Sequence, residues 1–280
     1  MTLHKGGVAK TTTVVSLADA LRRGGYRILV IDLDPQANCS KTLGESHPTA
    51  VGQTVRDLLL DDDNNIKVRD LIHPTKLPDV SLVYSSIKLG PVDFHIRAND
   101  PQPAQRLQRK LEEDLPYDFI LFDTPPHLGL FLLNALVASH HFIIPLQAGD
   151  KYSFDGLTDL VQFVGNAKRI NTNLNLLGML ITMYDSRQSA CKEILKSARE
   201  EYGEDVFNTV ITNSTAVRKA NLEGKTVLQF ERSSPAAKDY MSLAEEICHR
   251  LGWPTRRTLG ESAGRGPSIL PPGGIASTSA

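Results

Sequence analysis

Short apolar segments rich in β-branched residues recur along the chain and predict a sheet. Each segment is nearly continuous in hydrophobicity, which is typical of strands covered on both faces. Helical spacing lies between them: Leu157, Leu160, Val161 and Val164 follow the 0, 3, 4, 7 pattern of one buried stripe. This alternation predicts an α/β fold with a mostly parallel, doubly wound sheet flanked by helices. The predicted strands are 27–34, 80–86, 117–125, 141–148, 174–185 and 206–214.

Two segments depart from that alternation. Residues 61–65 read DDDNN and are expected to form a solvated loop or a frayed helix end. Residues 254–280 are rich in Gly, Pro, Ser and Ala and offer little to bury, so they are expected to form a disordered tail. The expected organisation is therefore one domain, 1–253, followed by the tail 254–280.

Composition narrows the classes of function. The chain has 280 residues, 41% of them hydrophobic, with 31 basic and 32 acidic side chains, so a nucleic acid or an anionic membrane would have to meet a local patch. The three cysteines are widely spaced and favour the reducing cytoplasm over a disulfide or zinc framework. The sequence contains no uninterrupted apolar run near the length of a bilayer span, and a membrane partner is not expected.

Residues 4–13, HKGGVAKTTT, resemble a phosphate-binding loop. Gly6 and Gly7 allow backbone amides to turn inward, and a helix predicted over about 11–23 points its positive end at the same place. In such a loop Lys10 reaches the β- and γ-phosphates of a nucleotide and the Thr11 hydroxyl ligates Mg²⁺. The alternative is a glycine turn that caps a helix, with Lys10 simply exposed.

Three aspartates follow predicted strands. Asp32 and Asp34 come at the end of RILVI, and Asp123 ends FILF, so all three are expected at the sheet edge where open α/β folds bind ligands. Asp123 occupies the position of an acid that holds Mg²⁺ directly or through water. Each aspartate taken alone could instead cap a helix, but the three together, at strand or loop ends, favour a site.

These motifs together resemble the ParA partition ATPases. The matching stretches are KGGVAKTT at 5–12, DLDPQ at 32–36, DTPP at 123–126 and PLQ at 145–147, and the resemblance covers the chain from Lys5 to about Gly252. It implies a P-loop NTPase fold. The family loop reads Lys-Gly-Gly-x-Gly-Lys-Thr, so His4 stands where the family needs no glycine, whereas Ala9 replaces a glycine.

The resemblance also implies roles for individual residues. Lys5 would be the signature lysine that crosses a homodimer interface to the partner's nucleotide, and Lys10 would bind phosphate. Thr11 and Asp123 would hold Mg²⁺, Asp34 would orient or activate the attacking water, and Asp32 would help to position metal-bound water or the loop. The nucleotide-binding residues would be Lys5, Gly6, Gly7, Val8, Ala9, Lys10, Thr11 and Thr12, and the cofactors ATP and Mg²⁺.

Two features of the loop region stay open at this level. Ala9 is harmless if its φ is negative, but costs about 1 kcal/mol or more in a left-handed conformation; we expect it to be tolerated. Only Met1 to His4 precede the loop, fewer than the five or six residues of an ordinary strand. Either the start lies inside a longer gene, or the first strand of the sheet is missing or truncated.

As a ParA-like protein the chain would bind double-stranded DNA without sequence preference in the ATP-bound state and be released by a ParB-type stimulator. It would be cytoplasmic and nucleoid-associated. Residues 218–257 carry eight Lys/Arg against five acids, which suits a DNA surface or an ordinary solvated one. The expected DNA contacts are Arg218, Lys219, Lys225, Arg232 and Lys238.

Three other functions stay open. A MinD-like membrane switch would need a C-terminal amphipathic helix, which the tail does not supply. The second is an enzyme on the same scaffold. An ATP-dependent ligase would need a substrate pocket, which the sequence does not identify, and a nitrogenase-iron-protein-like reductase would need cysteines placed to share a cluster, which Cys39, Cys191 and Cys248 do not fit. A scaffold that has lost nucleotide binding through Ala9 and the short start is the third.

Overall fold

The computed structural model of the protein describes residues 7–111, 114–149, 154 and 156–253. The strands are β1 (Ile28–Asp32), β2 (Ile72–Pro74), β3 (Val80–Val83), β4 (Phe119–Asp123), β5 (His141–Gln147) and β6 (Asn175–Thr182). The helices are α1 (Lys10–Arg23), α2 (Asn38–Leu43), α3 (Val55–Leu60), α4 (Val92–Asn99), α5 (Arg106–Lys110), α6 (Leu130–Val137), α7 (Leu157–Ile170), α8 (Ser189–Tyr202), α9 (Thr215–Leu222), α10 (Val227–Phe230) and α11 (Pro235–Arg250).

The strands form two sheets, one of order β2-β3-β1-β4 and one made of β5 and β6. The pairs β1–β3, β1–β4 and β5–β6 are parallel, and among the strands of the described residues only the short β2 is antiparallel to its neighbour. This confirms the predicted α/β class with a mostly parallel sheet. The prediction of one continuous sheet is refined, because β4 is the last strand of one sheet and β5 the first of the other.

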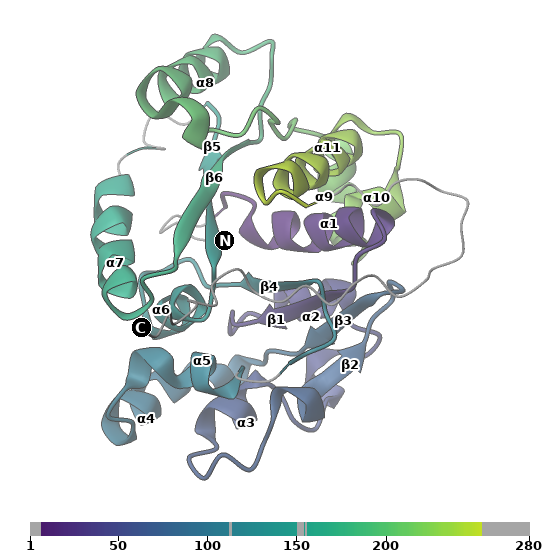
Figure 1. Ribbon diagram of the computed structural model, residues 1–280. Coiled ribbons are helices and arrows are strands. Elements are labelled where there is room, and N and C mark those ends of the chain that lie inside the picture. Colours follow the sequence, from purple (N-terminus) through teal and green to yellow (C-terminus); the bar gives the residue numbers. More distant parts are fainter. Residues whose placement is uncertain (1–6, 112–113, 150–153, 155, 254–280) are drawn as a thin grey trace, which may run out of the picture.

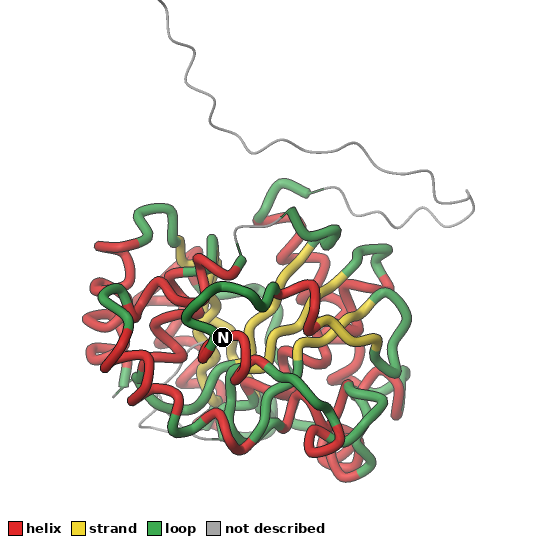
Figure 2. The backbone as a smooth tube through the Cα atoms, turned by 90° about the horizontal axis from the view of Figure 1, so that it is seen from below, coloured by secondary structure: helices red, strands yellow, loops and turns green. Residues whose placement is uncertain are grey.

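Helices cover both faces of the larger sheet. In Figure 1, α1 and α11 lie above β1 and β4, whereas α3, α4 and α5 lie below them. Alternate residues of β1 serve the two sides: Ile28 and Val30 pack with α1 and α11, and Leu29 and Ile31 pack with the helices below. Figure 2 shows the strands from below, with helices on either side.

Helix α1 carries the predicted loop at its start and is held firmly in the core. Val14, Leu17 and Leu21 are buried on one face, with the 0, 3, 7 spacing of an α-helix. Asp19 is buried as well, and it accepts hydrogen bonds from Arg23 at 2.8 Å and from Thr226, which precedes α10. This polar anchor ties α1 to the C-terminal helices and fixes the direction of its N-terminus.

The strand predicted over 206–214 is wrong. This segment makes only isolated bridges to Met179 and Tyr184. The amides of Phe207, Ile211 and Asn213 still donate to carbonyls of Met179, Ile181 and Tyr184. Carboxylates of α11 take the others: Glu246 accepts from Asn208 and Thr209, each at 2.8 Å, and Asp239 accepts from Thr212 at 2.8 Å. The segment therefore follows β6 through single hydrogen bonds, without the regular ladder of a strand.

Two local expectations also change. In α7, Leu157, Leu160 and Val164 are buried as predicted, but Val161 is 63% exposed, so the stripe is narrower than its sequence indicates. The acidic run is more than a solvated loop. Asp61 pairs with Lys110 at 2.7 Å and Asp62 with Arg106 at 2.6 Å, which anchors the end of α3 to α5.

Candidate nucleotide site

The carboxyl ends of β1 and β4 and the N-terminus of α1 meet at one place. Asp32 and Asp123 end their strands in register with each other, and α1 begins at Lys10 beside them. The structure therefore brings together the residues that the sequence predicts, at the sheet edge where α/β folds bind ligands. Lys10, Asp32 and Asp123 are all buried.

Thr11 and Asp123 form the contact that joins the loop to the sheet. The Thr11 hydroxyl donates to Asp123 Oδ2 at 2.8 Å, and the buried Oδ1 of Asp123 makes no hydrogen bond within the described residues. Burial raises the pKa of Asp123 to about 6, although the Thr11 hydrogen bond opposes the shift. A buried carboxylate oxygen without a hydrogen-bond partner and a neighbouring threonine hydroxyl are the kind of oxygen ligands that Mg²⁺ prefers.

Lys10 lies between two carboxylates at the start of α1. Burial lowers the pKa of its ammonium, while the nearby charges of Asp123 and Asp34 act in the opposite direction. A desolvated ammonium at the positive end of a helix is well placed to meet an anionic group. The N-terminus of α1, with Lys10, is therefore better suited to bind a phosphate group than a cation.

The Asp32 carboxylate accepts hydrogen bonds from the loop that follows β1. Its Oδ2 accepts from the amide and the hydroxyl of Ser40, at 2.9 and 2.7 Å, and its Oδ1 accepts from the amide of Asp34 at 3.0 Å. Burial and the charge of Asp123 raise the pKa of Asp32 to about 8, against these hydrogen bonds. These contacts support the loop-positioning part of its predicted role.

Asp34 is buried, 8% exposed, and its Oδ1 accepts from the amide of Gln36 at 2.9 Å. Asp32 holds the Asp34 backbone from behind. The side chain that is expected to orient water is therefore placed by a chain of hydrogen bonds that starts at Ser40.

The loop itself is described from Gly7 onward, and Lys5 and Gly6 lie outside the described residues. Gly7 has φ of +85°, which a glycine tolerates. Ala9 has φ of +64° and ψ of 28°, a left-handed conformation. Ala9 therefore adopts the conformation in which its methyl group is expected to destabilise the loop.

Two loop contacts were not predicted from the sequence. Thr182 at the end of β6 donates to the carbonyl of Val8 at 3.4 Å, and Asn221 of α9 donates to the Thr12 hydroxyl at 3.4 Å. Ser40 was missed too. The sequence offers no signal for Ser40 except its position eight residues after Asp32. Hydrophobic spacing does not predict the turn that brings Ser40 back to the Asp32 carboxylate.

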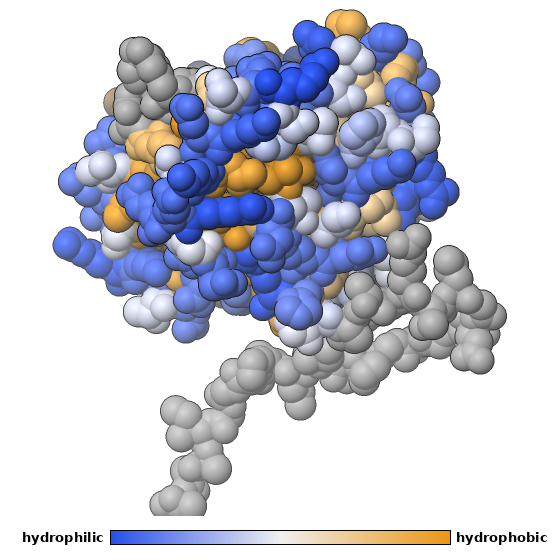
Figure 3. Space-filling view, turned by 90° about the horizontal axis from the view of Figure 1, so that it is seen from above, coloured by the Kyte–Doolittle hydropathy of each residue, from blue (hydrophilic) through white to orange (hydrophobic). Residues whose placement is uncertain are grey.

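The five predicted DNA contacts are exposed and come from the C-terminal helical layer. Arg218 and Lys219 lie on α9, Lys238 lies on α11, and Lys225 and Arg232 lie in the intervening turns. Lys225 pairs with Glu223 at 2.8 Å; within the described part of the chain the other four form no ion pair. Figure 3 shows the upper face of the molecule, where hydrophilic side chains dominate around a central apolar patch.

The described helices include none with the length and apolar character needed to cross a bilayer. The cysteines Cys39, Cys191 and Cys248 are buried and unbonded to one another.

Comparison with known proteins agrees with this geometry. A family model described as an AAA domain matches residues 1–176. The sporulation initiation inhibitor protein Soj of Bacillus subtilis is 34% identical over 249 residues, covering 88% of this chain and 96% of Soj. The chromosome partitioning protein ParA of Caulobacter vibrioides is 33% identical over 251 residues, 88% of this chain and 92% of that protein.

Among solved structures, a cobyrinic acid a,c-diamide synthase from Mycobacterium smegmatis with bound ADP and magnesium superposes with a TM-score of 0.76. It is 28% identical, and the match covers 90% of this chain and 93% of the synthase. The sequence relatives and the fold together show that this chain belongs to the ParA family of P-loop ATPases.

Proposed function

We propose that the chain is a partition ATPase that binds and hydrolyses Mg·ATP in the loop 5–12 and couples this cycle to DNA. The observation that carries the proposal is the convergence of Lys10, Thr11, Asp34 and Asp123 at the carboxyl ends of β1 and β4. The ADP and magnesium in the similar Mycobacterium structure support the choice of ligand.

Each residue has a chemical task in this proposal. Lys10 and the amides of the loop bind the phosphates, and Thr11 and Asp123 hold Mg²⁺, which supplies charge neutralisation when it is bound. Asp34 orients the attacking water, and Asp32 keeps the Asp34 loop in place through Ser40. Lys5 reaches across a homodimer to the nucleotide of the partner.

The basic surface of α9 and α11 is proposed to bind double-stranded DNA without sequence preference, because phosphates attract exposed Lys and Arg regardless of base. The Asn221–Thr12 hydrogen bond connects this layer with the nucleotide loop. A ParB-type protein is proposed to stimulate hydrolysis and release the DNA. The protein would then be cytoplasmic and nucleoid-associated.

The rival enzyme, an ATP-dependent ligase, shares the scaffold and the nucleotide site. What favours the partition reading is that the full-length sequence relatives are named Soj and ParA. The two functions differ in one measurable property, which is DNA binding that depends on the nucleotide.

The test is co-sedimentation of the chain with DNA in the presence of ATP, ADP or no nucleotide, together with ATP hydrolysis. We expect DNA binding with ATP alone, and loss of hydrolysis in Lys10→Ala. Lys196→Ala, on the distant helix α8, is the matched control and should change neither. DNA binding that is equal in all three nucleotide conditions would contradict the proposal.

A further inference from the structure

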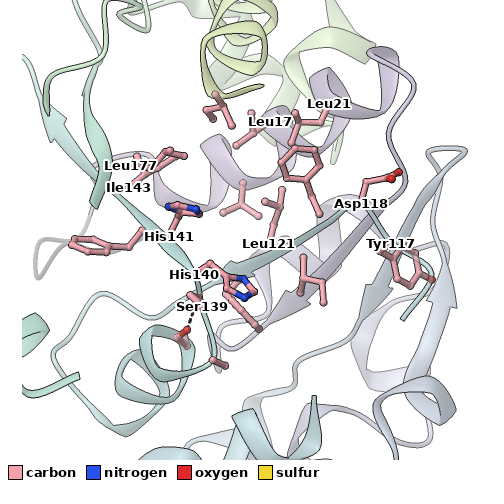
Figure 4. A pocket seen from close by; sticks show the side chains of 18 of the residues that line it. Leu17, Leu21, Tyr117, Asp118, Leu121, Ser139, His140, His141, Ile143 and Leu177 are labelled. Carbon is pink, nitrogen blue, oxygen red and sulfur yellow. Dashed lines mark hydrogen bonds between the residues drawn. The ribbon is translucent and has the colours of Figure 1, made fainter. Parts of the chain in front are cut away.

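Two of the cavities in the described part of the protein differ in chemical character. One of about 590 Å³ lies between β4 and β5, and Figure 4 shows Leu17, Leu121 and Ile143 around it. The described residues that line it include no Lys or Arg. The other, of about 470 Å³, lies between the loop that follows β1 and the N-terminal end of α3, and Lys41 and Arg56 are among its lining residues. We call this second cavity the α3 pocket.

Three cationic side chains from separate elements line the α3 pocket. Lys41 comes from α2, Arg56 from α3 and Lys88 from the turn that follows β3. Among the described residues that line the pocket, Asp57 is the only carboxylate. It is already bonded, because it accepts from the Thr54 amide at 2.9 Å and from Arg56 at 2.8 Å. Lys88 is exposed and takes part in no ion pair within the described residues. The pocket therefore carries an excess of positive charge, which favours an anionic ligand.

Much of the remaining lining of the α3 pocket is apolar. Pro35, Pro48, Val51 and Ile87 contribute hydrocarbon surface to it. Ile87 is 66% exposed, so its side chain is available to contact a ligand. Sites for small molecules commonly combine apolar walls with a few polar groups in a volume of roughly 300–1,000 Å³, and this pocket falls within that range. Its lining matches an anion that carries an apolar part.

One wall of the α3 pocket is the loop that carries Asp34. Pro35, Gln36 and Ala37 all line the pocket. The Lys41 ammonium donates to the carbonyl of Gln36 at 2.8 Å, and the Ala37 amide donates to the carbonyl of Asp34 at 2.8 Å. An ammonium has three donors, so Lys41 can bind an anion and the loop together. A ligand held by Lys41 would therefore lie against this loop and restrict its conformations.

We propose that the α3 pocket binds a small organic phosphate monoester. The phosphate lies among Lys41, Arg56 and Lys88, and the organic part packs on the apolar wall. A phosphate monoester carries about two negative charges near pH 7 and three acceptor oxygens, so it can pair with cations that come from separate elements. None of residues 7–12 lines the pocket, so the site is separate from the nucleotide loop. Because Asp34 is proposed to orient water, an occupied pocket would also regulate hydrolysis; that consequence rests on the proposed function, whereas binding does not.

The test titrates the full chain, without nucleotide, with phenyl phosphate, inorganic phosphate and phenol in a calorimeter. We expect phenyl phosphate to bind roughly tenfold more tightly than either of the other two, because only it meets both the cations and the apolar wall. Amide hydrogen exchange at Gln36 and Ala37 should slow when phenyl phosphate is bound. The proposal is wrong if phenyl phosphate does not bind, if it binds no more tightly than inorganic phosphate or phenol, or if exchange in the loop is unchanged.

Charge-reversal variants locate the binding site. Lys88→Glu should weaken phenyl phosphate binding roughly tenfold or more, because attraction becomes repulsion. Lys168→Glu makes the same change of charge on an exposed position of α7 and should leave binding intact. Equal losses in the two variants would show that only the net charge of the protein matters, and would contradict the proposal.

Two further variants separate the parts of the ligand and the two anion sites. Ile87→Ser should reduce the preference for phenyl phosphate over inorganic phosphate. Lys10→Ala, in the nucleotide loop, should still bind phenyl phosphate. A loss of binding in Lys10→Ala with no loss in Lys88→Glu would place the anion in the nucleotide loop and overturn the proposal. Because no nucleotide is present, the result does not depend on whether the protein is an ATPase.

Discussion

The hydroxyl of Thr11 lies 2.8 Å from Asp123 Oδ2, although 112 positions separate the two residues in the sequence. The contact joins the first turn of α1 to the end of β4. It leaves the buried Oδ1 of Asp123 without a hydrogen-bond partner in the described residues. A cost of this kind is common at functional sites, where a ligand completes what the apoprotein leaves unsatisfied.

Asp123→Asn is predicted to abolish the gain in ATP affinity that Mg²⁺ provides, while leaving the chain folded. An amide is a poorer ligand than a carboxylate for a hard cation. The measurement is ATP titration with Mg²⁺ and with EDTA. Asp118→Asn, immediately before the opposite end of β4, is the control and should retain the Mg²⁺ effect. An Asp123→Asn chain that still responded to Mg²⁺ would remove Asp123 from the metal site.

The same variant should change how the stability of the apoprotein depends on pH. Burial raises the pKa of Asp123 to about 6, above that of an unfolded aspartate near 4. A carboxyl with a raised folded pKa contributes stability that is fully present below the unfolded value and is lost as pH rises through the folded value. The melting temperature of the parent should therefore fall between about pH 4 and 6. Asp123→Asn should reduce this dependence of the melting temperature on pH.

Ala9→Gly is predicted to stabilise the protein by roughly 0.5–1 kcal/mol, because a left-handed alanine is strained and a glycine is not. Ala9 has φ of +64° in the structure. Since that conformation exists before any ligand binds, ATP affinity should change less than tenfold. Chemical denaturation and ATP titration measure the two effects.

Ala20→Gly is the contrast to Ala9→Gly. It lies in the buried interior of α1, where glycine costs about 1 kcal/mol, so its effect should have the opposite sign. A hundredfold rise in ATP affinity in Ala9→Gly would instead show that Ala9 distorts the loop.

The sequence predicts the class of fold and the location of the site, but it does not predict several of their details. The strands that end in Asp32 and Asp123 are continuous apolar runs followed by acids. The sequence alone therefore predicts that they are strands, where they lie in the chain and that they end at the same edge of the sheet. The left-handed Ala9 and the Asp32–Ser40 contacts depend on the path of a loop, which hydrophobic spacing does not encode. The segment 206–214 has the composition of a strand, but three of its amides bind Glu246 and Asp239 of a helix that comes later in the chain, and only isolated bridges join it to its neighbours.

Asp100→Asn is predicted to destabilise the protein by about 1–3 kcal/mol at neutral pH through the loss of a hydrogen-bonded charge. Asp100 is buried and pairs with Arg106 at 3.3 Å and with Arg109. Burial alone would raise its pKa, but the Gln102 amide and the two guanidiniums outweigh it and hold the pKa below its ordinary value. Its stabilisation is therefore present above about pH 4 and is lost at lower pH.

Thermal melts from pH 2 to 7 test this prediction. The parent should lose stability below about pH 4, and Asp100→Asn should lose less over the same range. Asp93→Asn, which removes a more exposed partner of Arg97, is the control and should cost under about 1 kcal/mol. Parallel acid limbs in the parent and in Asp100→Asn would show that the Asp100 pairs do not contribute.

Arg218→Ala and Lys238→Ala are each predicted to weaken ATP-dependent DNA binding without altering ATP affinity. Both side chains are exposed, on α9 and α11, and removing one phosphate contact lowers the slope of log K against log[salt] by about 0.9 for B-DNA. Binding measured at several salt concentrations gives that slope, and Lys196→Ala on α8 should leave it unchanged. Because contacts to phosphate carry no sequence information, the loss should be the same on unrelated DNA sequences; a loss confined to one sequence would point to base recognition instead.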